Sequence, residues 1–234
     1  MAENAELDSL LADCNGTSTS DQSGPCSGED VVTYHGYDYD IVEIGDQCWF
    51  AENARYLPEV SPSAEGSEDD GQPHAYVYDY QGNNITEAIA TSSYEVFGAL
   101  YNFPAVAQWT LCPTGWHVGN DENWKELESH LGMSAIELDW YFPNEGYERG
   151  QTEEVGAKLK ALTWDGINPT GFNALNTGWR WTGVFSFPNT AAFWTSTQID
   201  DQVSWARTLE TGQSGIVRQP YYPHFAKSVR CVKD

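Results

Sequence analysis

The pattern of apolar and polar residues between positions 121 and 131 predicts an amphipathic helix. Three large apolar side chains share one helical face: Trp124, Leu127 and Leu131. Three polar side chains are expected to face water: Lys125, Glu126 and Glu128. Asn120 or Asp121 can accept hydrogen bonds from the free amides at the start of the helix, and Gly132 suits a left-handed cap at its end.

Alternation with a period of two predicts strands on both sides of this helix. Residues 31–34 and 37–44 are expected to form a hairpin around Gly36, and Trp116 and Val118 are expected to be the buried positions of a short strand. Four later segments are expected to form one antiparallel sheet: 193–197, 203–210, 216–219 and 227–232.

Two further helices and two long connections complete the pattern. Residues 94–101 have helical spacing of large side chains and are expected to form a helix that stops near Pro104, and residues 155–162 form another helical stretch. Acidic residues 58–72 and the Gly- and Asn-rich residues 168–180 are predicted loops. The pattern therefore indicates a loop-rich α+β protein with two to three short helices and antiparallel sheets.

Six ordered blocks of sequence carry a family resemblance. They are 47–53 (QCWFAEN), 98–102 (GALYN), 112–118 (CPTGWHV), 171–175 (GFNAL), 193–197 (FWTST) and 228–232 (SVRCV). In this order they resemble the Fibrobacter succinogenes major paralogous domain. The resemblance implies a C-type lectin-like fold, in which the N- and C-terminal strands pair and a long loop region displays variable side chains. It also implies a secreted or surface protein of bacteria whose motifs carry no enzymatic activity.

The 234 residues divide into an arm and one domain. Residues 1–30 form an acidic arm or linker rich in Ser, Gly and Asn, and residues 31–234 are expected to form the C-type lectin-like domain. Ten Trp, thirteen Tyr and nine Phe suit the core of a loop-rich fold. No apolar run is long enough to span a membrane, and residues 1–12 lack the features of a secretory signal, so the export route stays open.

The formal net charge of −24 excludes some partners. Only one basic residue accompanies 22 acidic residues before Lys125, whereas ten basic residues accompany 13 acidic ones from Lys125 onward. Such a surface repels nucleic acid and anionic membranes. An acidic surface also keeps a protein soluble in salty surroundings, and this second explanation of the charge stays open.

The five cysteines indicate disulfides rather than a zinc site, because they show neither C-x-x-C spacing nor paired histidines. The resembled fold returns the last strand towards the strand of Trp116, which would bring Cys112 close to Cys231. Cys26 would then pair with Cys48 and leave Cys14 over. Spacing alone does not fix these pairs.

Motifs for catalysis and metal binding are sparse. Residues 211–215 lack the spacing of a Gly-x-Ser-x-Gly nucleophile turn, and no zinc-protease, phosphate-loop or dinucleotide motif is present. His117 is expected to be structural. Asp69-Asp70 and Asp200-Asp201 offer oxygen atoms to Ca²⁺, but the Glu-Pro-Asn and Trp-Asn-Asp triplets of calcium-dependent lectins are absent. We therefore expect no cofactor, with Ca²⁺ as an alternative.

Ligand contact is expected along the C-terminal sheet and its loops, which the resembled fold displays outwards. Their mixture of aromatic, Arg and amide side chains suits a recognition surface. The predicted ligand-binding residues are Gln198, Asp200, Asp201, Arg207, Glu210, Gln213, Arg218, Gln219, Tyr221, Tyr222 and His224. Arg207 and Arg218 are expected to be exposed and to bind most strongly. Trp205 and Val217 are expected to point into the sheet.

These observations favour a non-enzymatic recognition or adhesion domain, extracellular or displayed on a cell surface, that binds a protein or a glycan. One alternative is a structural or decoration subunit of a cell-surface or virion assembly, in which residues 15–30 reach a neighbouring subunit. A less favoured alternative is an enzyme of the related formylglycine-generating fold, which would need a reactive cysteine pair in a cleft. Fold alone does not choose among the three.

Overall fold

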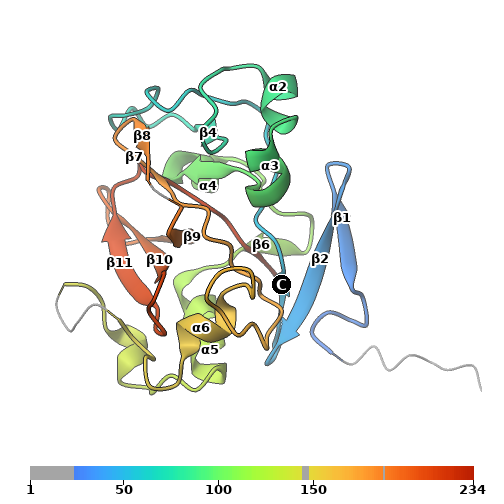
Figure 1. Cartoon of the computed structure of the whole chain (residues 1–234), viewed down its shortest axis with the longest axis vertical. Helices are drawn as coiled ribbons and strands as arrows, with labels where there is room; N and C mark the ends of the chain where they lie inside the picture. The colour runs from blue at the N-terminus through green and yellow to red at the C-terminus, as the bar shows by residue number, and fades with distance from the viewer. Residues whose placement is uncertain (1–23, 144–147, 187) are drawn as a thin grey trace, which may run out of the picture.

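The computed structural model describes residues 24–143, 148–186 and 188–234 (Figure 1). Short helices and three antiparallel sheets make an α+β fold. The helical elements are α2 (Ile85–Ile89), α3 (Ser92–Phe97), α4 (Phe103–Gln108), α5 (Asp121–His130), η2 (Glu137–Asp139) and α6 (Val155–Leu159). No helix in these ranges is long and apolar enough to cross a membrane. Most of the predicted arm, with Cys14, lies outside the described residues.

The first sheet has the strand order β1-β2-β3-β13-β6, the second β11-β10-β9 and the third β4-β5-β12-β7-β8. The strands are β1 (Val31–Tyr34), β2 (Tyr37–Ile44), β3 (Gln47–Phe50), β4 (Ala75–Tyr76), β5 (Leu100–Asn102), β6 (Trp116–Val118), β7 (Arg180–Trp181), β8 (Val184–Phe185), β9 (Thr190–Gln198), β10 (Ser204–Glu210), β11 (Val217–Tyr221), β12 (Ala226–Lys227) and β13 (Cys231–Lys233). Two large apolar cores lie among them, one around Tyr101 and Trp194 and the other around Trp49 and Trp124, beside a small third cluster of Tyr76, Leu100 and Ala226.

The N-terminal hairpin has the predicted boundaries. β1 and β2 pair in antiparallel register, and Gly36 supplies the positive φ of 77° that their tight turn requires. Tyr39 and Ile41 face the core, whereas Tyr37 stays partly exposed beneath the guanidinium of Arg55, 4.4 Å from its ring centroid.

The predicted amphipathic helix is α5, and its caps are those that the sequence favours. The Asn120 side chain accepts a hydrogen bond from the Asn123 amide, and the Asn123 side chain accepts one from the Asn120 amide. Gly132 follows the helix with a φ of 106°. Glu128 was expected to face water, but its side chain is fully buried in an ion cluster.

Two predicted helices have different boundaries. α3 lies at Ser92–Phe97, and Gly98 ends it with a φ of 72°, so residues 100 and 101 belong to β5 instead of the helix. Pro104 does not stop α3, because it sits in the first turn of α4, where its missing amide hydrogen costs nothing. The helix expected at 155–162 is the shorter α6.

The predicted four-stranded C-terminal sheet is wrong in its last strand. Only β9, β10 and β11 pair with one another. The last segment separates into β12, which joins β5 and β7, and β13, which lies between β3 and β6. The end of the chain therefore runs through the middle of the molecule (Figure 1).

Both expected disulfides are present. Cys26–Cys48 and Cys112–Cys231 have Cα–Cα distances of 5.0 and 5.8 Å, and all four cysteines are buried in the core around Tyr101. Each bond joins segments that are distant in the chain, and the second encloses the longer loop.

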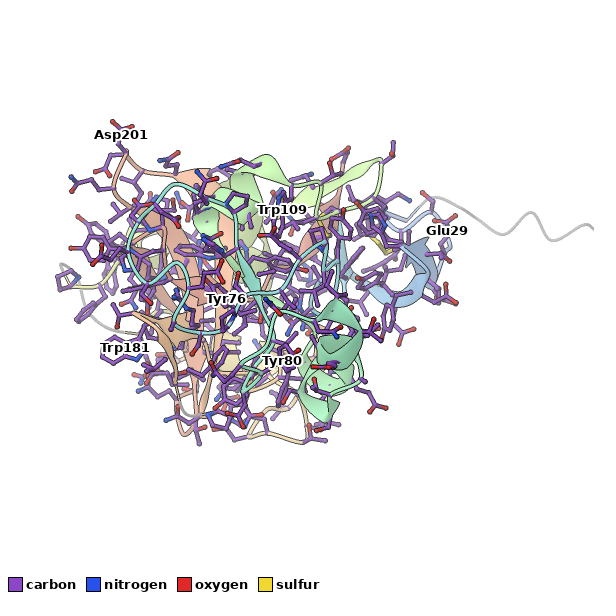
Figure 2. The ribbon with its side chains drawn as sticks, turned by 90° about the horizontal axis from the view of Figure 1, so that it is seen from above. Glu29, Tyr76, Tyr80, Trp109, Trp181 and Asp201 are labelled. Atoms are coloured by element: carbon purple, nitrogen blue, oxygen red, sulfur yellow. A yellow bond between two sulfur atoms is a disulfide. The ribbon has the colours of Figure 1, made fainter. Side chains whose placement is uncertain are left out.

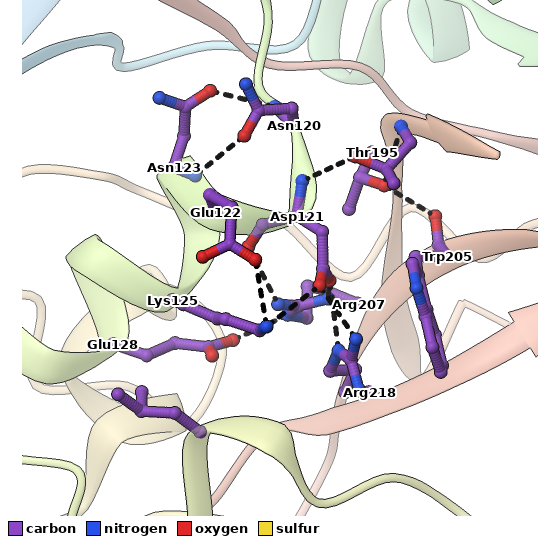
Figure 3. Close-up of polar contacts among 12 residues, drawn as sticks. Asn120, Asp121, Glu122, Asn123, Lys125, Glu128, Thr195, Trp205, Arg207 and Arg218 are labelled. Carbon is purple, nitrogen blue, oxygen red and sulfur yellow. Dashed lines mark hydrogen bonds and ion pairs between the residues drawn. The ribbon is translucent and has the colours of Figure 1, made fainter. Parts of the chain in front are cut away.

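The predicted ligand residues Arg207 and Arg218 are buried, so the expectation that they are displayed is wrong. Asp121 lies between them, accepting hydrogen bonds from Arg207 Nη1 at 2.8 Å and from Arg218 Nη2 at 2.7 Å (Figure 3). Glu128 accepts from Arg207 Nε at 2.6 Å and from Arg149 Nη2 at 2.8 Å. Both faces of β10 are covered, so alternation along this strand marks no outward position.

Arg230 and Lys160, two other buried cations, hold backbone carbonyls of loops and strand ends. Arg230 donates to the carbonyl oxygens of Phe50, Phe172 and Asn173, at distances of 2.6 to 3.2 Å. Lys160 donates to the carbonyls of Glu210 and Gln213. All 11 Lys and Arg lie in the described ranges; eight are buried and the rest, Lys125, Lys158 and Lys233, are half-buried. Positive charge is therefore confined to the interior and its margin.

Loss of the Cys112–Cys231 bond should destabilise the protein more than loss of Cys26–Cys48. The two bonds span 119 and 22 residues. In the chain-entropy model these loops correspond to about 5 and about 3 kcal/mol. Urea unfolding of Cys112→Ala/Cys231→Ala and of Cys26→Ala/Cys48→Ala measures both losses. Equal losses of stability in the two variants would contradict the dependence of disulfide stabilisation on loop length.

The free energy of unfolding should fall on acidification. Burial alone would raise the pKa of Asp121, but the hydrogen bond from Arg218 and the charge of Arg207 lower this pKa well below its usual range. A carboxyl group with a lower pKa when folded adds stability above about pH 4, and this stability is lost as pH falls towards the folded pKa.

Asp121→Asn should flatten part of that fall and cost about 3 to 5 kcal/mol at pH 7, because Arg218 loses its charged partner and Arg207 keeps only Glu128. Urea unfolding of both proteins between pH 7 and pH 2 tests this. If the free energy of unfolding fell as steeply with pH in the variant as in the wild type, Asp121 would not be the source of the acid sensitivity.

Candidate ligand-binding cleft

A cleft of about 510 Å³ opens between four loops. Its lining residues are Ser67, Glu68, Asp69, Thr182, Gln202, Tyr222 and His224. They come from the acidic loop 58–72, the β7–β8 turn, the β9–β10 loop and the β11–β12 loop. Asp201 and Trp181, next to two of the lining residues, project on the opposite side of the molecule from Glu29 (Figure 2). We call the cleft formed by the seven lining residues, Ser67 to His224, the acidic-loop cleft.

Local geometry fixes two walls of the cleft. Trp181 pairs with Val184 across a two-residue turn in which Thr182 and Gly183 have φ values of 30° and 85°. Positive φ at both central positions matches the twist of a tight hairpin. In the β11–β12 loop, the rings of Tyr222 and His224 stack with centroids 5.8 Å apart and planes 11° apart.

Arg180 joins the acidic loop to the β11–β12 loop. Its side chain is fully buried and donates to the carbonyl oxygens of Ser63 at 2.9 Å and Glu65 at 2.7 Å in the acidic loop. It also donates to the carbonyl oxygen of His224 at 2.6 Å in the β11–β12 loop. One guanidinium thus sets the separation of two loops that lie more than a hundred residues apart in the sequence.

Several polar side chains in the cleft have no hydrogen-bond partner among the described residues. Glu68, Thr182, Gln202 and Tyr222 make no side-chain hydrogen bond to any described residue, and His224 Nδ1 is buried without one. Burial lowers the pKa of His224, opposed by the charge of Asp69, so the imidazole is neutral near pH 7. The cleft therefore offers a carboxylate, hydroxyls, an amide and stacked rings to a ligand.

The structure brings only part of the predicted ligand set together. Tyr222 and His224 line the cleft, and Asp200 and Asp201 are exposed in the β9–β10 loop, beside Gln202. Gln198 is exposed at the end of β9. These residues keep their predicted role in ligand contact as an untested expectation.

The rest of the predicted set lies elsewhere. Gln219 donates to the hydroxyl of Tyr221 on β11, and the Tyr221 ring packs against Trp194 in the interior. Glu210 and Gln213 lie at the far end of β10, where their carbonyls hold Lys160. Of the two residues expected to point inwards, Val217 is buried, and Trp205 is half-buried with Arg218 over its ring.

Sequence reasoning missed Arg180, Glu68, Asp69 and Thr182 as parts of one site. The acidic run 58–72 was visible, but its approach to Tyr222 depends on the donors of Arg180.

Within the described ranges, no group of three or more His, Cys, Asp or Glu is placed to hold a metal ion. His117 contacts Asp234 at 2.6 Å and Asn123 at 2.9 Å, which suits its expected structural role.

Arg180→Ala should loosen the cleft as well as destabilise the fold. It leaves the carbonyls of Ser63, Glu65 and His224 without their charged donor, at a cost of about 2 to 4 kcal/mol. Urea unfolding measures the cost, and hydrogen exchange should show faster exchange in residues 58–72. Tyr222→Ala, at an exposed position, is the control and should change stability by less than about 1 kcal/mol. If hydrogen exchange in residues 58–72 were unchanged in Arg180→Ala, Arg180 would not hold the acidic loop in place.

Comparison with known proteins gives one match. The model of the Fibrobacter succinogenes major domain family matches residues 42–233. Neither the curated proteins nor the solved structures contain a match. Because the family model covers most of the sequence, this chain belongs to the Fibrobacter succinogenes major domain family.

Proposed function

We propose that this chain is a non-enzymatic recognition or adhesion domain that binds a protein or glycan ligand outside the cell through the acidic-loop cleft. The observation that carries the proposal is a cleft held in shape by Arg180, in which the side chains of Glu68, Thr182, Gln202 and Tyr222 make no hydrogen bond to any described residue. Polar groups left unpaired at the rim of a formed cleft favour binding, because a ligand can pair them without first breaking internal bonds.

We infer a C-type lectin-like fold from the pairing of the terminal strands and from the long loops between them. β13 near the C-terminus pairs with β3 near the N-terminus, and the segments between them include long loops. In such a fold the paired strands set the frame while the loops carry the contacts. The cleft side chains come from loops, so they are free to differ without disturbing either core.

An extracellular location is supported by the disulfides. Cys26–Cys48 and Cys112–Cys231 are both buried in the core, and such structural bonds persist in oxidising surroundings. The family resemblance points in the same direction, since its members are mostly secreted or surface proteins of bacteria.

A second function, as a subunit of a surface assembly, is favoured by one apolar patch. Trp181 and Val184 are about half exposed beside a separate cleft of about 400 Å³ lined by Trp179, Trp181, Phe185, Ser186 and Asn189. Exposed apolar area of this kind suits contact between subunits. Light scattering after size exclusion separates the two functions, because a defined oligomer that Trp181→Ser breaks would favour assembly and a monomer would favour recognition.

The proposal predicts that Tyr222→Ala reduces attachment without unfolding the domain. Fluorescently labelled protein would be added to cells and extracellular polymers of the producing culture, and bound label counted by flow cytometry. We expect at least a tenfold loss for Tyr222→Ala, because the exposed ring forms one wall of the cleft. The matched control is Glu29→Ala, on the opposite side of the molecule, which should attach like wild type (Figure 2). Equal attachment by all three proteins would reject the cleft as the binding site.

A further inference from the structure

Electrical charge narrows the class of partner that the acidic-loop cleft accepts. Glu68 and Asp69 line it, Asp70 follows them in the chain, and Asp200 and Asp201 lie in the loop that supplies Gln202. None of these five carboxylates forms an ion pair with a lysine or arginine in the described part of the chain. A neutral ligand would leave this negative potential uncompensated.

No lysine or arginine is exposed that could supply the compensation. All 11 Lys and Arg are buried or half-buried, and Arg180 beneath the cleft is occupied by the carbonyls of Ser63, Glu65 and His224. Its guanidinium fixes the loops without reaching Glu68 or Asp69 in an ion pair. A positively charged partner would complement the potential of this cleft.

The shape and chemistry of the cleft fit a guanidinium better than a compact ion. Two of the lining groups are suited to it: the carboxylate of Glu68, which forms no ion pair, and the exposed ring of Tyr222, stacked on His224. A guanidinium donates several hydrogen bonds in one plane and lies against aromatic faces, whereas an ammonium acts as a point charge. Because the imidazole of His224 is neutral, it adds no repulsion.

We propose, on the basis of the recognition function above, that the acidic-loop cleft captures an arginine-bearing extended segment of a partner protein. The guanidinium pairs with Glu68 and Asp69 and lies on the ring of Tyr222, while Thr182 and Gln202 bond to the backbone of the segment. The volume of about 510 Å³ accommodates an arginine side chain with the residues on either side of it.

The test uses a labelled peptide, acetyl-Gly-Arg-Gly-Arg-Gly-amide, and the same peptide with citrulline in place of arginine. Citrulline keeps the planar shape and loses the charge. Fluorescence anisotropy at 150 mM NaCl should show binding of the arginine peptide and at least tenfold weaker binding of the citrulline peptide. Glu68→Gln and Asp69→Asn should each weaken the arginine peptide about three- to tenfold.

Glu29→Gln is the matched control, because it removes one negative charge from the opposite side of the molecule (Figure 2). It should leave peptide binding unchanged. Equal weakening by Glu29→Gln and Glu68→Gln would show attraction to the acidic surface as a whole and would overturn the proposal, as would equal binding of both peptides.

Failure of this proposal is separable from failure of the recognition function. If Tyr222→Ala abolishes attachment to cells but neither peptide binds, recognition stands and the arginine-bearing partner is rejected. Binding of a glycan that requires Tyr222 and is indifferent to Glu68→Gln would likewise reject it and assign the cleft to a sugar. If attachment and peptide binding both ignore the cleft variants, both proposals fail.

Discussion

Hydrogen-bond donors for buried, irregular backbone are the requirement on which this structure depends. Short helices and short strands leave many carbonyl groups in loops that pass through the interior, and a buried carbonyl without a donor is costly. Arg230 serves three such carbonyls, Arg180 serves three and Lys160 serves two. A guanidinium suits this work because its donors diverge in one plane and can reach several loops at once.

This use of cations shapes the surface as well as the core. Other buried cations meet carboxylates, as Arg207 meets Asp121 and Glu128, whereas Lys227 lies among the rings of Trp179 and Tyr221. The other acids in the described ranges are exposed or half-buried, with no exposed Lys or Arg among them. The negative exterior is therefore partly a by-product of how the loops are held together, and the cleft inherits this potential from the fold.

Local elements were predictable from sequence because local interactions determine them. The β1–β2 hairpin follows from alternation and Gly36, and α5 follows from its apolar face and the Asn120 cap. Residues 100 and 101 misled the prediction, since their helical spacing after Phe97 competes with a strand pairing to β4 and β12 that only the whole fold supplies. The same holds for Arg207, whose burial depends on α5 covering β10 from a distant part of the chain.

The candidate site follows the same rule. Tyr222 and His224 were recognisable from their residue types, and the acidic run was visible in composition. Their meeting was not, because it rests on Arg180, whose position between a loop and a two-residue strand carries no local signal. Sequence patterns thus identified several residues of the cleft, and only the tertiary contacts bring them together.

The central place of β13 in the first sheet has a consequence for how the protein is made. β3 and β6 do not touch one another in the sheet order; each pairs with residues 231–233. The third sheet has the same property, since β5 and β7 meet only through β12. While these residues are still inside the ribosome, neither of these two sheets can close, whereas the sheet of β9, β10 and β11 needs no later strand. Folding of the whole domain therefore waits until synthesis has passed residue 233.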